Sequence, residues 1–308
     1  MESRLDRTPL LGDAQYRMLC DRVREHCGLN FGQDSRYLVE KRVARRQESL
    51  GISSVAAYLY ELRRGDSGRE ELVELVDELT TNETYFFREV RQLRALIHEI
   101  VPERRLQHPD RPVTIWSAGC ASGEEPYSVV MMALEAGLRP GTDLRVYASD
   151  IAPSVLARAR RGTYRTASFR ETSQLMREKY FTEKDGEFRI HDDVKKHVDF
   201  IQLNLMDAER IELLGQVDVV LCRNVIIYFD QETKARVIQT FHDRLRPGGY
   251  LLLGHSESLV TLSTAFELCH LREDLVYRRP LTGQDRIDPW RRLAEQATAE
   301  VEARERGR

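Results

Sequence analysis

The chain has 308 residues, of which 41% are hydrophobic and 31% charged, so it can bury a large core, and its length suggests about two domains. A formal net charge of -3 argues against wholesale binding to nucleic acid. No run approaches the roughly 20 apolar residues that span a bilayer, and the first residues lack the layout of a signal peptide. We therefore expect a cytoplasmic protein without direct membrane insertion.

The first part of the chain, up to about residue 80, is expected to be all-helical because apolar residues recur at spacings of three and four. The expected helices cover roughly 13 to 27, 34 to 50, 53 to 64 and 68 to 80. Asp34 and Ser53 are the expected N-caps. Gly28, Gly51 and Gly65 stand where helices would end.

From Val113 onward, short apolar runs alternate with helical stretches. The runs are "VTIWSAG", "LRVYASD", "VDFIQL", "VDVVLCRN" and "GYLLLGH". This alternation predicts an α/β fold with a mainly parallel, doubly wound sheet and helices on both faces. "FELCH" and "LVYRR" lie too close together for a crossover helix, so we expect an antiparallel hairpin at the sheet edge.

A break in this alternation indicates an inserted unit. "YFTEKDGEFRIHDDV" predicts a small β-hairpin turned at Asp185 and Gly186. We therefore expect an all-helical domain at 1–80, an α/β domain at 81–280 with an inserted β-subdomain at about 163–197, and a polar tail at 281–308. The tail either forms one helix after Asp288 or stays disordered.

The stretch "VTIWSAGCASGEEPYS" predicts a strand, a glycine-bearing turn and a helix. Gly119 and Gly123 would let the backbone approach a ligand where the strand order reverses. Glu124 and Glu125 would repel a pyrophosphate at the helix start, so a cationic or hydroxyl-rich ligand suits the turn better than a nucleotide phosphate. An ordinary strand-to-helix turn is the alternative.

Polar side chains also end three further strands. Asp150 ends "LRVYASD", where an acidic residue accepts hydrogen bonds from both hydroxyls of a ribose or caps the next helix. Asn204 and Asp207 follow the run "VDFIQL". Arg223 and Asn224 end an apolar strand, and because buried polar groups need partners, this pair favours a site over a plain turn.

Several motifs resemble, in the same order, those of the CheR-type chemotaxis receptor methyltransferases. They are "TNETYFFRE", "IWSAGCASGEEPYS", "VYASDI", "CRNVIIYF" and "LLLGHSESL". The resemblance covers roughly residues 10 to 280 and implies a glutamate O-methyltransferase that uses S-adenosylmethionine and no metal. It implies the products glutamyl methyl ester and S-adenosylhomocysteine, made on chemoreceptors for sensory adaptation. It also implies a helical N-terminal domain before a doubly wound, Rossmann-like domain with a small β-subdomain.

The resemblance assigns roles to individual residues. Cofactor contacts are implied for Asn82, Thr84, Arg88, Glu125, Asp150, Asn204, Leu205, Arg223 and Asn224. Among these, Asp150 matches the ribose contact, and Asn204 and Leu205 match the pair near the adenine. Tyr228 matches an aromatic residue close to the transferred methyl. Arg88 is the second candidate catalytic residue, holding either the methionyl carboxylate of the cofactor or the incoming glutamate.

The implied reaction needs alignment more than acid-base chemistry. A glutamate nucleophile is already ionised near neutral pH, since its reference pKa is about 4.3. Positioning of the nucleophile, methyl and sulfur then supplies most of the rate. No histidine is therefore assigned to catalysis, and an acidic Glu125 suits a cationic cofactor.

A basic band is expected on the helix that contains "SRYLVEKRVARRQESLG". It consists of Lys41, Arg42, Arg45 and Arg46. Val39, Val43 and Leu50 fall on a different side of this helix. Such a band is usually a solvated face. The implied partner, the glutamate-rich cytoplasmic helical methylation region of chemoreceptors, would dock against it.

Other partners and activities follow less directly. In some family members the β-subdomain binds the receptor's C-terminal pentapeptide by strand addition, with a longer loop than the turn in "FTEKDGEFRI", so we expect no such tether here. We expect a monomer that binds no nucleic acid. Two alternatives remain: a methyltransferase for a nucleic-acid base or small molecule, which the lack of an "NPPY"-like clamp disfavours, and a non-catalytic S-adenosylmethionine-binding regulatory module.

Overall fold

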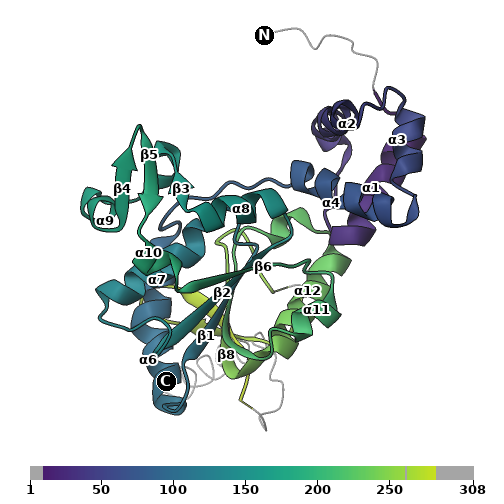
Figure 1. Cartoon of the computed structure of the whole chain (residues 1–308). Helices are drawn as coiled ribbons and strands as arrows, with labels where there is room; N and C mark the ends of the chain where they lie inside the picture. The colour runs from purple at the N-terminus through teal and green to yellow at the C-terminus, as the bar shows by residue number, and fades with distance from the viewer. Residues whose placement is uncertain (1–9, 261, 282–308) are drawn as a thin grey trace, which may run out of the picture.

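The computed structural model describes residues 10–260 and 262–281. Its first helices form a separate bundle beside the α/β unit (Figure 1). They are α1 (Asp13–Cys27), α2 (Arg36–Leu50), α3 (Val55–Glu61) and α4 (Gly65–Leu79), with a 3₁₀ turn η1 (Gln33–Ser35) before α2. Leu19, Val43, Tyr58 and Leu75 are among the buried residues of its core. The all-helical character predicted for this part is confirmed.

The predicted helix ends are right in part. Gly28 and Gly51 end α1 and α2 in the left-handed region, with φ of 81° and 67°. Gly65 begins α4 instead of ending α3, because α3 already ends at Glu61. The N-cap of α3 is Ser54, whose side chain accepts a hydrogen bond from the Ala57 N–H, and not Ser53. Asp34 lies inside η1 and is not a cap.

A seven-stranded sheet forms the second unit, in the order β6-β2-β1-β7-β8-β10-β9. Its strands are β1 (Val113–Ala118), β2 (Leu144–Asp150), β6 (Val198–Gln202), β7 (Val217–Cys222), β8 (Leu245–Leu253), β9 (Glu267–His270) and β10 (Leu275–Arg278). β6, β2, β1, β7 and β8 pair in parallel, whereas β10 is antiparallel to β8 and β9. The doubly wound sheet and its terminal hairpin are confirmed.

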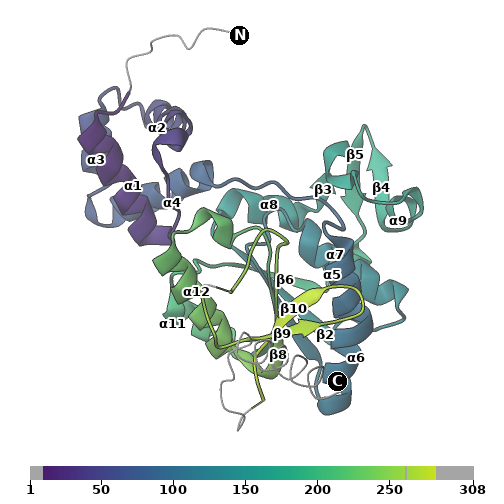
Figure 2. The same ribbon diagram turned by 180° about the vertical axis from the view of Figure 1, so that it is seen from behind.

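Helices cover both faces of the sheet (Figure 2). Alternate residues of each strand therefore face opposite helix layers. Ile115 of β1 packs in the core that includes α5 (Val90–Ala95), the π-helical turn η2 (Leu96–Ile100), α6 (Val101–Gln107), α7 (Glu124–Glu135) and α8 (Pro153–Arg161). Trp116, the next residue, packs in the core that includes α11 (Ala208–Glu212) and α12 (Gln231–Arg244). Buried strands covered on both faces explain the continuous apolar runs in the sequence.

The inserted unit is a small sheet in the order β3-β5-β4, from β3 (Thr163–Tyr164), β4 (Phe181–Lys184) and β5 (Glu187–Ile190). Around it lie η3 (Thr166–Phe169), α9 (Gln174–Tyr180) and α10 (Asp192–Lys195). Asp185 and Gly186 turn the hairpin with φ of 53° and 76°, as expected for a two-residue turn. The possible helix after Asp288 lies outside the described residues.

The helical bundle packs against the carboxyl end of the sheet. Leu29 and Phe229 form an isolated antiparallel bridge, and the Asn30 N–H donates to the Tyr228 carbonyl at 2.9 Å. Because the strand order reverses at β1, the carboxyl ends of β1 and β7 form the switch point of the sheet. Within the described ranges, no helix combines the length and apolar character needed to cross a membrane.

Candidate functional site

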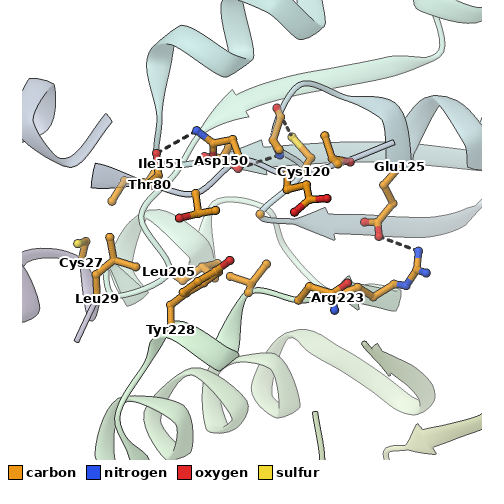
Figure 3. A pocket seen from close by; sticks show the side chains of 18 of the residues that line it. Cys27, Leu29, Thr80, Cys120, Glu125, Asp150, Ile151, Leu205, Arg223 and Tyr228 are labelled. Atoms are coloured by element: carbon orange, nitrogen blue, oxygen red, sulfur yellow. Dashed lines mark hydrogen bonds and ion pairs between the residues drawn. The ribbon is translucent and has the colours of Figure 1, made fainter. Parts of the chain in front are cut away.

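A pocket opens at the switch point (Figure 3). Every residue predicted above as a cofactor contact or catalytic residue lines it: Asn82, Thr84, Arg88, Glu125, Asp150, Asn204, Leu205, Arg223, Asn224 and Tyr228. They come from residues 81–89, which form the joint between the helical bundle and the α/β unit, and from the ends of β2, β6 and β7. Glu125 lies in the first turn of α7. The fold thus brings together residues that lie up to about 145 positions apart in the chain.

Arg223 is the centre of a buried ion cluster on one side of the pocket. Its side chain is 2% exposed, and its Nη1 donates to Glu125 Oε2 at 3.0 Å. Its Nη2 donates to the Glu89 carboxylate at 3.1 Å and to the Arg88 carbonyl at 2.5 Å. Ser117 Oγ donates to the other oxygen of Glu125. Of the two carboxylates around this guanidinium, Glu125 lines the pocket and Glu89 does not.

Asp150, on the opposite side of the pocket in Figure 3, is buried at the end of β2. One carboxylate oxygen accepts the Ala121 N–H at 2.9 Å, and the other accepts the Ala152 N–H at 3.0 Å. Burial raises the pKa of Asp150, while these N–H donors act in the opposite direction. Each oxygen keeps a further lone pair for a ligand hydroxyl. The N-cap of α8 is Ala152, without a side-chain hydrogen bond, so the expectation that Asp150 caps this helix is wrong and the ligand interpretation remains.

Asn224 and Tyr228 stand on the loop after β7. Asn224 has φ of 61°, in the left-handed region, and its buried Oδ1 has no hydrogen-bond partner among the described residues. Tyr228 is 37% exposed and lies at the pocket beside Leu205.

The joint that contains "TNETYFFRE" is held by the inserted unit and α7. The Phe86 N–H donates to the Ser168 carbonyl, and the Phe87 N–H donates to Ser128 Oγ, both at 2.9 Å. Phe86 packs edge-on against Tyr164, within a group of aromatic rings of the inserted unit. The joint is therefore an anchored wall of the pocket in addition to a connection between helices.

The helical bundle supplies part of the wall that sequence reasoning missed. Cys27 and Leu29 line the pocket, and the Asn204 Nδ2 donates to the His26 carbonyl at 2.6 Å. Asn204 Oδ1 accepts the Met206 N–H, so this side chain is occupied by protein contacts. In the sequence, Cys27 and Leu29 are marked only by their position beside the helix-ending Gly28. That position does not reveal that this segment contacts the loop after β7.

The glycine turn after β1 differs from expectation. A Cβ on Gly119 would lie 2.5 Å from Val225 Cγ2, and one on Gly123 would lie 2.9 Å from Ala159 Cβ. These glycines therefore allow close packing of protein segments, although Gly119 also lines the pocket. Glu124 is buried away from the pocket lining.

Two other acidic groups have structural contacts. Ser122 Oγ and Ser168 Oγ donate to the Glu124 carboxylate at 2.8 and 3.0 Å. Asp207 caps α11 by accepting the Arg210 N–H and does not line the pocket. The expectation that Asp207 contributes a polar group to the site is therefore not met.

The basic band on α2 is mostly paired with α4. Arg46 donates to both oxygens of buried Glu71, at 3.0 and 2.7 Å, and Arg42 donates to Glu78 at 3.2 Å. Arg45 also reaches Glu78, at 3.5 Å, but is half exposed, and Lys41 is exposed. The band thus divides into Arg42 and Arg46, which join two helices, and Lys41 and Arg45, which face solvent.

The apolar side of α2 is also different from the prediction. Val39 and Val43 are buried as expected. Leu50 is 42% exposed at the last turn, and Gln47 is buried in its place, where its Nε2 donates to the Ile52 carbonyl. Helix periodicity places Gln47, four residues after Val43, on the same face, whereas Leu50 lies at the end of the helix.

The residues present fit a nucleoside cofactor that carries positive charge. Asp150 offers acceptors for sugar hydroxyls, Leu205 and Ile151 offer apolar surface, and Glu125 favours a cation. A doubly wound sheet with acidic strand ends around a switch-point pocket is typical of S-adenosylmethionine-dependent methyltransferases. No group of three or more potential metal ligands occurs in the described part of the chain.

The family follows from comparison with known proteins. The model "CheR methyltransferase, SAM binding domain" matches residues 82–275, and "CheR methyltransferase, all-alpha domain" matches residues 14–80. The chain therefore belongs to the CheR methyltransferase family and has its S-adenosylmethionine-binding domain.

Curated relatives are similar over most of their length. Chemotaxis protein methyltransferase 2 of Vibrio cholerae is 36% identical over 277 residues, covering 89% of this chain and 96% of the relative. Chemotaxis protein methyltransferase of Salmonella typhimurium is 33% identical over 263 residues, covering 84% of this chain and 88% of the relative. Magnesium protoporphyrin IX methyltransferase from Synechocystis PCC 6803, solved with bound S-adenosylmethionine, is 13% identical, with a TM-score of 0.35. The match covers 77% of this chain and 95% of that protein, and it is too distant to inform function.

Proposed function

We propose that this methyltransferase transfers the methyl group of S-adenosylmethionine to glutamate side-chain carboxylates of chemoreceptors. The products are glutamyl methyl esters and S-adenosylhomocysteine, and the role is sensory adaptation. The observation that carries the proposal is the convergence of the predicted residues on one switch-point pocket. The curated relatives, named chemotaxis protein methyltransferases, support the receptor as the substrate.

Each wall of the pocket has a role in this proposal. The cofactor, when bound, supplies an activated methyl group on a sulfonium. Asp150 would accept hydrogen bonds from its ribose hydroxyls, and Glu125 would stabilise its positive charge. Tyr228 would stand beside the methyl and, with the joint at Asn82 and Thr84, would keep water away. The substrate glutamate arrives ionised, so rate depends on how closely these walls align it.

Arg88 has two possible carboxylate partners. Arg88 lines the pocket, and its Nη1 donates to the Glu83 carbonyl at 3.0 Å, so other N–H donors remain for a ligand. Arg88→Lys keeps the charge but loses the planar fork. A rise in the Kd of S-adenosylhomocysteine in this variant assigns Arg88 to the cofactor carboxylate. A rise in the receptor KM alone assigns it to the substrate glutamate.

The direct test of the substrate uses methyl-labelled S-adenosylmethionine and purified chemoreceptors. We expect label that base releases from the receptor and that peptide mapping places on glutamate. Tight binding of the cofactor without transfer would support the regulatory-module alternative. Transfer to nucleic acid or to a small molecule, with none to receptors, would support the other acceptor class.

Receptor docking is proposed to use the solvent-facing part of the basic band. Lys41 and Arg45 face outward and complement a glutamate-rich helical region. Lys41→Glu combined with Arg45→Glu should raise the receptor KM about tenfold, with the Kd of S-adenosylhomocysteine unchanged. Arg69→Glu is the matched control, an exposed arginine on α4. If the Lys41/Arg45 double variant and Arg69→Glu changed the receptor KM equally, the basic band would have no specific role in receptor recognition.

The absence of a receptor tether and the monomeric state are further proposals. The β4–β5 hairpin turns in two residues, Asp185 and Gly186, and this tight loop is the reason to expect no binding of the receptor's C-terminal pentapeptide. Calorimetry with that pentapeptide should show no tight complex. Light scattering should give the mass of one chain, and a dimer mass would overturn the monomer proposal.

A further inference from the structure

The segment "GHSES" follows β8 and contains Glu257, whose carboxylate points to the loop between β7 and α12. Oε2 accepts the N–H groups of Asn224 at 2.8 Å and Gly254 at 2.7 Å. Oε1 accepts those of Val225 at 3.0 Å and Ile227 at 3.2 Å. One carboxylate therefore binds four backbone donors, three of them from the same loop.

The loop that Glu257 holds is a wall of the pocket. Asn224, Val225 and Tyr228 all line the pocket, whereas Glu257 itself does not. Asn224 is in the left-handed region, a conformation that costs free energy for a residue with a side chain unless its surroundings hold it there. The end of β8 also packs on it directly, because a Cβ on Gly254 would lie 2.7 Å from Asn224 Nδ2.

The two ends of the loop are fixed by different parts of the molecule. The helical bundle holds one end, where the Tyr228 carbonyl accepts the Asn30 N–H. Glu257 holds the other end. Burial raises the pKa of Glu257, and its N–H donors act against this rise. A partly buried carboxylate with this many donors is a strong local constraint on the backbone.

We propose that Glu257 is a positioning residue for methyl transfer: its carboxylate fixes the backbone of residues 224–227 and thereby sets the places of Asn224 and Tyr228 in the pocket. The inference rests on the function proposed above. Glu257→Gln preserves volume but places an amide NH₂ among N–H donors, so some of the donors lose their acceptor. The loop is then released while the strands that carry it remain paired.

A double-mutant cycle separates positioning from general stability. The variants are Glu257→Gln, Asn224→Gly and the pair, with Gly chosen because it accepts the left-handed conformation. We expect each single change to weaken S-adenosylhomocysteine binding about tenfold in calorimetry, and the pair to weaken it no further, because Asn224 is already misplaced without Glu257. Additive losses in the pair would refute the positioning role.

Kinetics give the second readout. In Glu257→Gln the kcat for receptor methylation should fall about 100-fold through misplacement of Tyr228, with the receptor KM within about threefold of the original. Glu209→Gln, an exposed change of the same type on α11, is the control and should leave both constants unchanged. An unchanged kcat in Glu257→Gln would also refute the proposal. If this variant does not fold, Glu257→Asp, which keeps the charge and withdraws the acceptor by one methylene, replaces it in both experiments.

The failure of this proposal and of the proposed function are distinguishable. The binding cycle uses no receptor, so a non-additive cycle in a protein that methylates no receptor supports the loop role and overturns receptor methylation. Receptor methylation by the unaltered protein, together with an additive cycle, overturns the role of Glu257 alone.

Discussion

Strand β7 has a buried ion cluster at each end, and the two clusters have opposite compositions. At its start, Asp218 is fully buried and surrounded by arginines: Arg104 and Arg111 donate to its carboxylate at 2.6 to 3.2 Å, and Arg246 lies 3.7 Å away. Just after its end, Arg223 lies between Glu89 and Glu125.

The difference between the clusters separates stability from function. The Asp218 cluster ties α6 and the segment before β1 to the sheet, and its residues do not line the switch-point pocket. The Arg223 cluster lies on the pocket wall, and each of its carboxylates keeps a side-chain exposure of 14%. We therefore expect damage at the first to act mainly on folding and damage at the second mainly on methyl transfer.

The largest effect is expected at the second cluster. Arg223→Gln leaves two carboxylates without their shared cation and releases the Arg88 carbonyl, which holds the joint in place. The kcat/KM for receptor methylation should fall about 1000-fold, or about 4 kcal/mol. The melting temperature should fall less than in the Asp218 variant, because Glu89 and Glu125 each keep 14% exposure whereas Asp218 is fully buried. If Arg223→Gln lowered the melting temperature without lowering kcat/KM, the Arg223 cluster would have the same structural role as the Asp218 cluster.

The second effect is expected at the first cluster. Asp218→Asn removes the carboxylate that pairs with Arg104, Arg111 and Arg246, of which Arg104 is also buried. The free energy of unfolding should fall by about 3 kcal/mol, because a buried charge is left unpaired. Thermal denaturation measures the loss. Methylation at 20 °C should stay within about threefold of the original, and a much larger drop would link this cluster to the site.

Part of the sheet topology follows from the sequence because it depends on local pattern. The parallel strands of the large sheet fall on short apolar runs, and the polar residues at their ends, such as Asp150 and Arg223, meet because parallel strands share an edge. The resemblance supplied the joint residues, such as Arg88, which no local pattern assigns to the pocket.

Other features depend on contacts between distant segments and could not be read from the sequence. Leu29 reaches the pocket through a bridge to Phe229, 200 positions later. Arg46 looks like part of a solvated band until Glu71 is placed against it. Glu257 follows β8 as an ordinary polar residue, and only the fold brings the 224–227 backbone to it.

Acid titration sharpens the comparison at the Asp218 cluster. Burial alone would raise the pKa of Asp218, but hydrogen bonds from Arg111, the Thr114 N–H and Arg104 outweigh it and lower the pKa to about 2. Because the folded value lies below the ordinary value of 3.8, the ionised group stabilises the fold above pH 3.8. About 2 kcal/mol should be lost as the pH falls from 3.8 toward 2. Asp218→Asn should lack this part of the acid dependence.

The smallest effect is expected at the edge of the same cluster. Arg246 is 3.7 Å from Asp218 and partly exposed, and it also donates to the Gln216 carbonyl. Arg246→Gln should change the free energy of unfolding by less than about 1 kcal/mol. Urea denaturation measures it. A loss as large as that of Asp218→Asn would make Arg246 a core member of the cluster.

The central claim, that the joint closes a methyl-transfer site at the switch point, is tested most directly by Arg88→Ala. The measurement is transfer of label from methyl-labelled S-adenosylmethionine to chemoreceptor glutamates, with circular dichroism as the check on folding. Arg94→Ala, an exposed arginine on α5, is the matched control and should retain activity. We predict that Arg88→Ala folds and transfers no label. Near-normal transfer by this variant would contradict the account, because the joint would then only connect helices and have no role in methyl transfer.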